Sequence, residues 1–297
     1  MTTDIYTTDE AHGKNWTMLL GDSCERMTEL ADESVDLSVY SPPFASLFTY
    51  SPSPRDLGNS ASRGEFFDHY GFIIRENLRI TKPGRIACVH VQQLTTTKST
   101  NGFVGLTDFR GDVIRAYVEA GWIFHGEVTV NKDPQAQAIR TKAQALMFVT
   151  KNRDSSMTRP ALADYLLLFR KPGDNAVPIK NDVTNEEWID WAQPVWWDIK
   201  ETNTLNARVA RDNEDERHIC PLQLDFIERC IRLWSNEGET VFSPFGGIGS
   251  EPYTAVKLGR QALAIELKPT YWQTAVRNLQ DIEAALDLPS LFDGATA

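Results

Sequence analysis

The chain has 297 residues, of which 41% are hydrophobic and 24% are charged, and its formal net charge at pH 7 is −11. This length suits one large α/β domain with a smaller insertion, and the apolar share can build a full core. No stretch of 18 apolar residues is present, which excludes a membrane-spanning helix. The N-terminus lacks the basic and apolar regions of a signal peptide, so we expect a cytoplasmic protein.

The cysteines and histidines predict no site of their own. Four cysteines, at positions 24, 88, 220 and 230, form no Cys-x-x-Cys pair, and we interpret them as reduced thiols. The five histidines are scattered without the spacing of metal ligands, and we interpret them as surface or satisfied core residues. We therefore expect no metal site.

Seven apolar runs predict strands along the chain. They are Trp16–Leu20, Val35–Tyr40, Arg85–Val91, Trp122–Val130, Tyr165–Arg170, Glu239–Phe242 and Gln261–Glu266. Helical patterns lie between most of them, for example Glu65–Ile80, Asp108–Glu119, Asp225–Trp234 and Pro269–Leu286. This alternation predicts an α/β fold with a mostly parallel, doubly wound sheet and helices on both faces. An antiparallel pair at one edge is the alternative for the fourth and fifth runs.

The second of these runs ends in Ser41-Pro42-Pro43-Phe44. Proline has no amide hydrogen and a fixed φ, so the carbonyl groups at this turn are rigid and exposed. A hydroxyl, fixed carbonyl oxygens and an aromatic face can together hold a flat heterocycle through its amino group. Acceptors that hold both N–H groups favour the rehybridised amine, whose lone pair can attack an electrophilic methyl group. An ordinary strand-ending turn is the alternative interpretation.

The sixth run is followed by a glycine-rich turn, Ser243-Pro244-Phe245-Gly246-Gly247-Ile248-Gly249-Ser250, and then by a helical stretch over Glu251–Leu258. A turn of this kind lets a ligand approach the backbone closely. The next strand ends at Glu266, about 20 residues past the glycines, where an acid binds the ribose diol in nucleoside-binding βαβ units. A plain tight turn is the alternative.

Together the two motifs resemble those of beta-class DNA amino-methyltransferases, the circularly permuted kind found in restriction–modification systems and phages. In that family the Ser/Asp-Pro-Pro-aromatic motif lies N-terminal and the Asp-Pro-Phe-x-Gly-x-Gly-Thr cofactor motif lies C-terminal. Two residues depart from the second motif, because Ser243 stands where Asp is usual and Ser250 where Thr is usual. The first departure removes a negative charge near the methionine ammonium of the cofactor.

Further segments extend the resemblance. Gly21-Asp22 is similar to the family's Gly-Asp pair, whose acid bonds the adenine of S-adenosyl-L-methionine, and His218–Leu224 is similar to its His-Pro-Ala-Pro-Phe-Pro segment. The resemblance implies a Rossmann-like, seven-stranded methyltransferase sheet. It implies catalysis by Ser41, Pro42, Pro43 and Phe44. It implies cofactor binding by Asp22, Pro221, Leu222, Ser243, Pro244, Phe245, Gly246, Gly247, Gly249 and Glu266.

The resemblance also divides the chain into parts. Residues 1–172 correspond to the catalytic half, 173–215 to an inserted target-recognition region and 216–297 to the cofactor-binding half of the same domain. The middle part carries four tryptophans, which form either a small local core or stacking platforms. Residues 45–64, rich in Ser, Pro, Gly and Asn, form either a lid over the target base or a surface loop.

The net charge predicts weak non-specific binding to DNA unless charge is segregated. Residues 131–172 carry eight basic and three acidic side chains, a local charge of +5. They are a candidate surface for double-stranded DNA, and a solvated loop face is the alternative. A homodimer and a cognate restriction endonuclease are further candidate partners that the sequence does not decide.

The resemblance implies that a base flipped out of the duplex is methylated at its exocyclic amine by in-line displacement on S-adenosyl-L-methionine. A carbon-5 mechanism would require a cysteine nucleophile, and no Pro-Cys pair exists in the chain. Serine at the first catalytic position favours cytosine N4 in this family, with adenine N6 as the alternative. A non-catalytic S-adenosyl-L-methionine- or nucleotide-binding module is the hypothesis of another class. A NAD-dependent oxidoreductase is a third hypothesis, which the catalytic tetrad disfavours.

Overall fold

The computed structural model describes residues 7–44, 57, 60, 62–135, 151, 152, 154, 156, 158–180, 182–206 and 221–288. The strands in these ranges are β1 (Asp9–His12), β2 (Trp16–Leu20), β3 (Val35–Tyr40), β4 (Thr81–Gln92), β5 (Leu94–Thr96), β6 (Gly105–Thr107), β7 (Ile123–Val130), β8 (Asp164–Arg170), β9 (Val195–Trp196), β10 (Thr240–Ser243) and β11 (Gln261–Glu266). The helices are α1 (Ser23–Arg26), the 3-10 turn η1 (Met27–Glu29), α2 (Arg63–Ile80), α3 (Lys98–Asn101), α4 (Phe109–Glu119), α6 (Asn185–Trp191), α7 (Leu224–Trp234), α8 (Ser250–Lys257) and α9 (Pro269–Asp287).

One large sheet organises the fold, in the order β1-β2-β11-β10-β3-β4-β8-β7-β9. The five strands from β2 to β4 in this order are parallel to one another, as the alternation of strands and helices predicts. Strand β8 runs antiparallel to both β4 and β7. The antiparallel alternative for the fourth and fifth predicted strands is therefore correct, although β9 lies outside them at that edge.

The predicted count of seven strands is wrong for the described residues, because two short strands extend this sheet to nine. Strand β1 adds to the free side of β2, and the two-residue strand β9 adds to β7. Neither carries a sustained apolar run, so the hydrophobic pattern gave no sign of them. All seven predicted strands and the four quoted helices are present within a few residues of their expected bounds.

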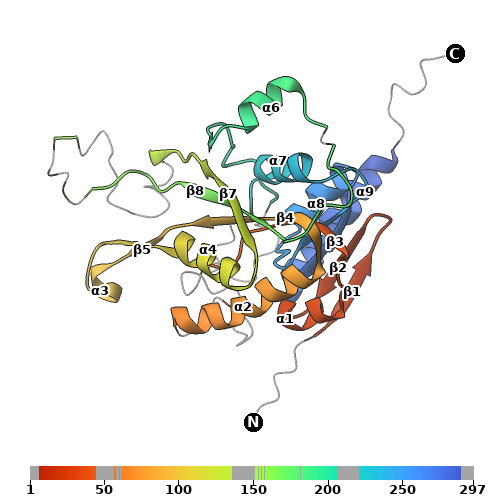
Figure 1. Ribbon diagram of the computed structural model, residues 1–297, viewed down its shortest axis with the longest axis horizontal. Coiled ribbons are helices and arrows are strands. Elements are labelled where there is room, and N and C mark those ends of the chain that lie inside the picture. The colour runs from red at the N-terminus through yellow and green to blue at the C-terminus, as the bar shows by residue number, and fades with distance from the viewer. Residues whose placement is uncertain are drawn as a thin grey trace, which may run out of the picture.

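Helices cover both faces of the sheet, and Figure 1 shows α2 and α4 on one side and α7 on the other. Alternate residues of each strand point to opposite faces. On β3, Val39 belongs to the core with α7, α8 and α9, whereas Tyr40 belongs to the core with α2 and α4. Both side chains are fully buried, which explains why the central strands read as continuous apolar runs.

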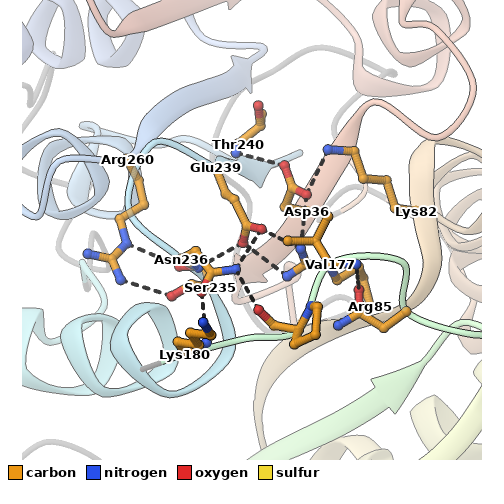
Figure 2. A network of polar contacts seen from close by, with 12 residues as sticks. Asp36, Lys82, Arg85, Val177, Lys180, Ser235, Asn236, Glu239, Thr240 and Arg260 are labelled. Carbon is orange, nitrogen blue, oxygen red and sulfur yellow. Dashed lines mark hydrogen bonds and ion pairs between the residues drawn. The ribbon is translucent and has the colours of Figure 1, made fainter. Parts of the chain in front are cut away.

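A polar network joins the amino ends of the parallel strands (Figure 2). Arg85 on β4, 1% exposed, donates to Glu239 at 3.0 Å and through a second, shorter contact, and its guanidinium lies 3.4 Å from Asp36 on β3. Lys82 donates to Asp36 at 2.7 Å, and the backbone amide of Thr240 donates to the same carboxylate at 3.0 Å. These contacts tie the starts of β3, β4 and β10 together.

The segment after β8 is attached to the same end of the sheet. The backbone amide of Lys180 donates to the side chain of Asn236 at 2.8 Å, and that side chain donates to the carbonyl of Pro178 and to Glu239. Residues 173–180 thus lie at the amino ends of the parallel strands. The carboxyl ends, at the opposite edge, are free to carry a site.

Several other predictions can be compared with the structure only for the residues that it describes. Among the described residues, no helix is long and apolar enough to cross a membrane. Cys24, Cys88 and Cys230 are free thiols in the part of the chain described, and no group of metal-ligating side chains occurs there. Most of the proposed lid at 45–64 and the whole of 207–220 lie outside the described residues.

Candidate active site

The Ser-Pro-Pro-Phe turn and the glycine-rich turn follow neighbouring parallel strands. Strands β3 and β10 pair in register with Phe242 opposite Ser38, so both turns leave the sheet at its carboxyl edge. The ring of Phe245 lies 5.7 Å from that of Tyr40, the residue just before Ser41. Two segments separated by about 200 positions in the sequence therefore meet at one site, as a topological switch of an α/β sheet allows.

The catalytic turn is held by the neighbouring strand. The Ser41 hydroxyl lies 3.1 Å from Nδ1 of His90 on β4 and 3.2 Å from the carbonyl oxygen of that residue. Pro42 is buried, whereas Ser41, Pro43 and Phe44 remain partly exposed. The Phe44 ring packs edge-on against Phe109 at 6.0 Å between centroids and lies 6.3 Å from the His90 ring. One aromatic ring and one hydroxyl are thus fixed side by side at the sheet edge.

A buried charged group lies behind Ser41. Nε2 of His90 is 3.0 Å from Oδ2 of Asp164 on β8, and the ammonium of Lys132 is 2.6 Å from the same oxygen. The other oxygen, Oδ1, accepts a hydrogen bond from Gln92 at 2.8 Å. Burial would raise the pKa of Asp164, but His90 and Lys132 outweigh burial and hold this pKa below its ordinary value. The carboxylate is therefore ionised at neutral pH.

The glycine-rich turn presents backbone where side chains would collide. A Cβ atom at Gly246 would lie 2.7 Å from Met18 and 3.2 Å from the carbonyl oxygen of Ile265. The amide of Gly246 donates to that same carbonyl at 2.7 Å, which keeps the turn against β11. Gly249 has φ +90° and a Cβ there would lie 3.0 Å from Ala275 on α9. Glycine is therefore favoured at both positions, at Gly249 by its left-handed backbone and at Gly246 by the nearby carbonyl oxygen of Ile265.

Glu266 ends β11 beside this turn. Its carboxylate accepts hydrogen bonds from the backbone amides of Gly247 and Lys268, each at 2.8 Å. A carboxylate oxygen can accept more than one hydrogen bond, so these amide contacts do not by themselves preclude a bond from a diol. Asp22 lies across the same edge, where its side chain caps α1 by accepting from the amide of Cys24 at 2.9 Å.

Unpaired polar groups are buried around the glycine turn. The hydroxyls of Ser243 and Ser250, residues 1% and 3% exposed, have no hydrogen-bond partner among the described residues. Glu251 is also buried in the first turn of α8, where burial, with a smaller contribution from Glu266, raises its pKa to about 8. Buried polar atoms without partners are rare in folded proteins. The two unpaired hydroxyls, with the buried carboxyl of Glu251 nearby in sequence, are therefore suited to contact a polar ligand.

The other predicted cofactor residues are anchored in the core or beside it. Leu222 is 6% exposed and belongs to the core with α7, whereas Pro221 just before it is partly exposed. The carbonyl of Pro244 accepts a hydrogen bond from Ser23 at 2.5 Å. The histidine of the predicted segment, at position 218, lies outside the described residues.

Two lysines of the basic segment at 131–172 are not part of the DNA-binding surface that its composition predicts. Lys132 is 6% exposed because it pairs with Asp164 inside the site. The ammonium of Lys171 donates to the carbonyl of Thr81 at 2.7 Å, at the far edge of the sheet. These two lysines therefore do not belong to a DNA-facing patch, and Arg140, Lys142 and Arg153 lie outside the described residues.

The tryptophans of the middle region divide between the two interpretations. Trp196 on β9 is 1% exposed and belongs to the core with α7, and it donates to the carbonyl of the partly exposed Trp191 at 2.9 Å. Trp188 and Trp197 are 49% and 68% exposed, so neither is part of that core.

Three residues of the site were not predicted from the sequence. They are His90, Asp164 and Glu251, and each is buried among apolar side chains or within a helix. The sequence signal for His90 was a histidine inside the apolar run of β4, the strand that pairs with β3.

Comparison with known proteins identifies the family. The N6_N4 DNA methylase family model matches residues 35–277 of the chain. The chain belongs to this family. Type II methyltransferase M.MjaI of Methanocaldococcus jannaschii is 22% identical over 284 residues, 85% of this chain and 87% of that protein. Type II methyltransferase M.BglI of Bacillus subtilis is 31% identical over 117 residues, which span 39% of this chain and 30% of M.BglI.

Solved structures share the fold of this DNA methylase. TTHA0409 of Thermus thermophilus, described as a putative DNA modification methylase and solved with S-adenosyl-L-methionine, has a TM-score of 0.67 at 23% identity over 89% of this chain and 93% of its own. The PvuII DNA methyltransferase, described as cytosine-N4-specific, has a TM-score of 0.60 at 18% identity over 95% and 96%. At these identities the likeness shows the fold alone.

Family membership decides between the hypotheses of different class. The chain is a DNA amino-methyltransferase that uses S-adenosyl-L-methionine, rather than an oxidoreductase or a non-catalytic binding module. Its α/β fold and mostly parallel sheet agree with this assignment.

Proposed function

We propose that this DNA methylase transfers the methyl group of S-adenosyl-L-methionine to N4 of a cytosine flipped out of duplex DNA. The observation that carries the proposal is the meeting of the Ser-Pro-Pro-Phe turn and the glycine turn at adjacent strand ends, β3 and β10. The catalytic turn precedes the cofactor turn in the chain, which is the motif order of the beta class. The proposal therefore includes the circularly permuted arrangement.

The catalytic turn acts by positioning the amine. Ser41 and the Pro42 carbonyl accept the two amino hydrogens, Pro43 keeps the turn rigid and Phe44 stacks on the base. Accepting both hydrogens concentrates electron density on the nitrogen as its lone pair leaves conjugation with the ring, so these bonds strengthen in the transition state. Phe44 is partly exposed and braced edge-on by Phe109, which suits a ring that must receive a planar base.

The cofactor supplies an electrophilic methyl group on a sulfonium when it is bound. Its nucleoside end would be held by Glu266 and Asp22, with Leu222 and Pro221 from the segment before α7. Its methionine end would lie on Ser243–Gly249, where Gly247 has no side chain to cover the backbone. Burial raises the pKa of Glu251 to about 8, so its carboxyl is protonated at neutral pH in the cofactor-free chain. The ammonium of a bound cofactor would lower that pKa, and the ionised Glu251 would then supply the negative charge that Ser243 lacks.

The identity of the first catalytic residue favours cytosine N4 over adenine N6. This residue is Ser41, and serine at this position favours cytosine in the resemblance described above.

Target recognition is proposed for residues 183–206 rather than the full 173–215, because residues 173–180 are bonded at the opposite edge of the sheet. The exposed Trp197, just after β9, is the candidate contact to DNA. The described residues give no argument for a homodimer or a cognate restriction endonuclease, so neither belongs to this proposal.

Mass spectrometry of nucleosides from DNA of cells expressing the chain tests the proposal. N4-methylcytosine is the expected product, absent from DNA of cells that express the Ser41→Ala variant. N6-methyladenine in its place would overturn the choice of base, and the absence of both from an expressed, folded protein would overturn the proposed function.

A further inference from the structure

His90 on β4 lies next to Ser41 and is surrounded by residues on or just after β3, β8 and β7. The hydroxyl of Ser41, after β3, faces Nδ1 of His90 on β4 at 3.1 Å. The other ring nitrogen, Nε2, faces Asp164 on β8 at 3.0 Å, and Lys132, after β7, closes the group at 2.6 Å. The sequence motifs contain only Ser41 of these residues. A hydroxyl, an imidazole and an ionised carboxylate in this order form the arrangement that serine hydrolases use to move a proton.

Amine methylation releases a proton that the two sequence motifs do not account for. The nitrogen–carbon bond forms as the methyl carbon separates from sulfur, whose electron pair stays on the sulfur. The amine nitrogen then carries two hydrogens, the methyl group and a positive charge, whereas the neutral product carries one hydrogen. One proton must therefore pass to an acceptor within reach of the nitrogen. Serine alone is too weak a base to keep it.

We propose that His90 receives this proton through the Ser41 hydroxyl, with Asp164 stabilising the resulting imidazolium. This inference rests on the proposed placement of the amine at Ser41. As the amine gives its proton to the Ser41 oxygen, the Ser41 proton passes to Nδ1, and the serine ends unchanged. His90 is then a positively charged ring and the methylated amine is neutral, so atoms and charges balance.

The surroundings of His90 suit this role better than a packing role. Nε2 is buried and lies 3.0 Å from the Asp164 carboxylate, yet it has no well-directed hydrogen bond among the described residues. The carboxylate is therefore in place to stabilise the ring once it becomes an imidazolium. The Phe226 ring on α7 lies nearly perpendicular to the imidazole, at 5.2 Å between centroids, and His90 is only 7% exposed. The charged groups of the described elements around the ring are Asp164 and, behind it, Lys132.

Lys132 sets the strength of the acceptor. Its ammonium balances part of the carboxylate charge, and Gln92 satisfies the remaining oxygen. A fully unpaired carboxylate would bind the imidazolium too tightly to let it return the proton to solvent after each turnover. An ionised Asp164 whose charge is partly balanced by Lys132 still favours the imidazolium, and it allows the proton to leave again.

Single-turnover methyl transfer tests the inference, with tritiated S-adenosyl-L-methionine and unmethylated duplex DNA between pH 5.5 and 8.5. The wild-type rate is expected to fall at acidic pH, because an imidazole that is already protonated accepts no further proton. His90→Gln is expected to lower the rate at pH 8 by roughly 10²–10⁴-fold, the range of general acid–base catalysis, and to abolish the pH dependence. Cofactor affinity, measured by calorimetry, is expected to stay within about twofold, since His90 does not belong to the proposed cofactor site.

His125→Gln is the matched control, because His125 is exposed on β7, and it is expected to behave as wild type. A His90→Gln rate within about threefold of wild type, with the acidic decline retained, would overturn the inference. If His90→Gln fails to bind cofactor, the pH profile of the wild-type enzyme alone decides. A wild-type transfer rate that does not change between pH 5.5 and 8.5 would also overturn the inference. Full activity in Ser41→Ala would instead overturn the proposed function.

Discussion

Glu251→Gln tests the state of the buried carboxyl beside the glycine turn. Burial raises the pKa of Glu251 to about 8, against 4.5 for an ordinary glutamate. Between these two values the folded chain holds a proton that the unfolded chain releases. Stability therefore falls as pH rises from 4.5 to about 8, because the unfolded state binds fewer protons over that window.

The magnitude follows from the size of the pKa shift. Each pKa unit corresponds to about 1.4 kcal/mol, so wild type would lose about 3 kcal/mol between pH 4.5 and 7, and about 5 kcal/mol once Glu251 is fully ionised in the folded chain. Glutamine has the same shape and no charge at any pH. The variant should match wild type near pH 4.5 and exceed it by about 3 kcal/mol at pH 7.

Urea denaturation of the cofactor-free protein at pH 4.5, 6, 7 and 8.5 measures this difference directly. Glu65→Gln is the matched control, since Glu65 also lies in the first turn of a helix, α2, but is exposed. For the control we expect a difference within about 1 kcal/mol at every pH, the usual range for a charge at an exposed helix end. A Glu251→Gln difference that stays constant from pH 4.5 to 8.5 would refute the reasoning.

Three further substitutions test other parts of the account. Arg85→Met should destabilise the fold by about 3–5 kcal/mol in urea denaturation, because it removes the buried guanidinium that pairs with both Glu239 and Asp36. Lys82→Met, whose side chain is 43% exposed, should cost about 1 kcal/mol or less. Equal effects of these two would contradict the network of Figure 2. Gly246→Ala should weaken cofactor binding at least tenfold in calorimetry, because its Cβ would lie 2.7 Å from Met18, and Gly238→Ala, where a Cβ meets nothing within 4 Å, should leave binding unchanged. Glu251→Gln should weaken cofactor binding about tenfold or more at pH 8, since it removes the charge proposed to face the ammonium, and unchanged affinity would remove Glu251 from the cofactor site.

The positions of the central strands along the chain could be predicted because the local sequence encodes them. The central strands are buried on both faces, so their residues form continuous apolar runs, and the glycines at 246 and 249 mark positions where a side chain would be crowded or strained. The two short edge strands could not be predicted this way. Strand β9 consists of Val195 and Trp196 only, and its pairing with β7 depends on contacts between segments about 65 residues apart.

The charged part of the site was hidden for a different reason. Lys132 and Asp164 looked like ordinary members of a polar segment, and only the antiparallel pairing of β7 and β8 brings them to His90. A buried lysine and a solvated lysine have the same sequence signature. The composition of the segment therefore assigned Lys132 to a DNA-binding surface, whereas its burial beside Asp164 decides its role.

The meeting of the two turns in one reaction centre is tested most directly by a pair of variants assayed for both cofactor binding and methyl transfer to duplex DNA. Ser41→Ala should bind S-adenosyl-L-methionine as wild type does while losing transfer by about 100-fold or more, an effect of the size expected for removing a transition-state contact. Glu266→Ala should lose cofactor affinity first. Full transfer by Ser41→Ala, or unimpaired binding by Glu266→Ala, would contradict the account.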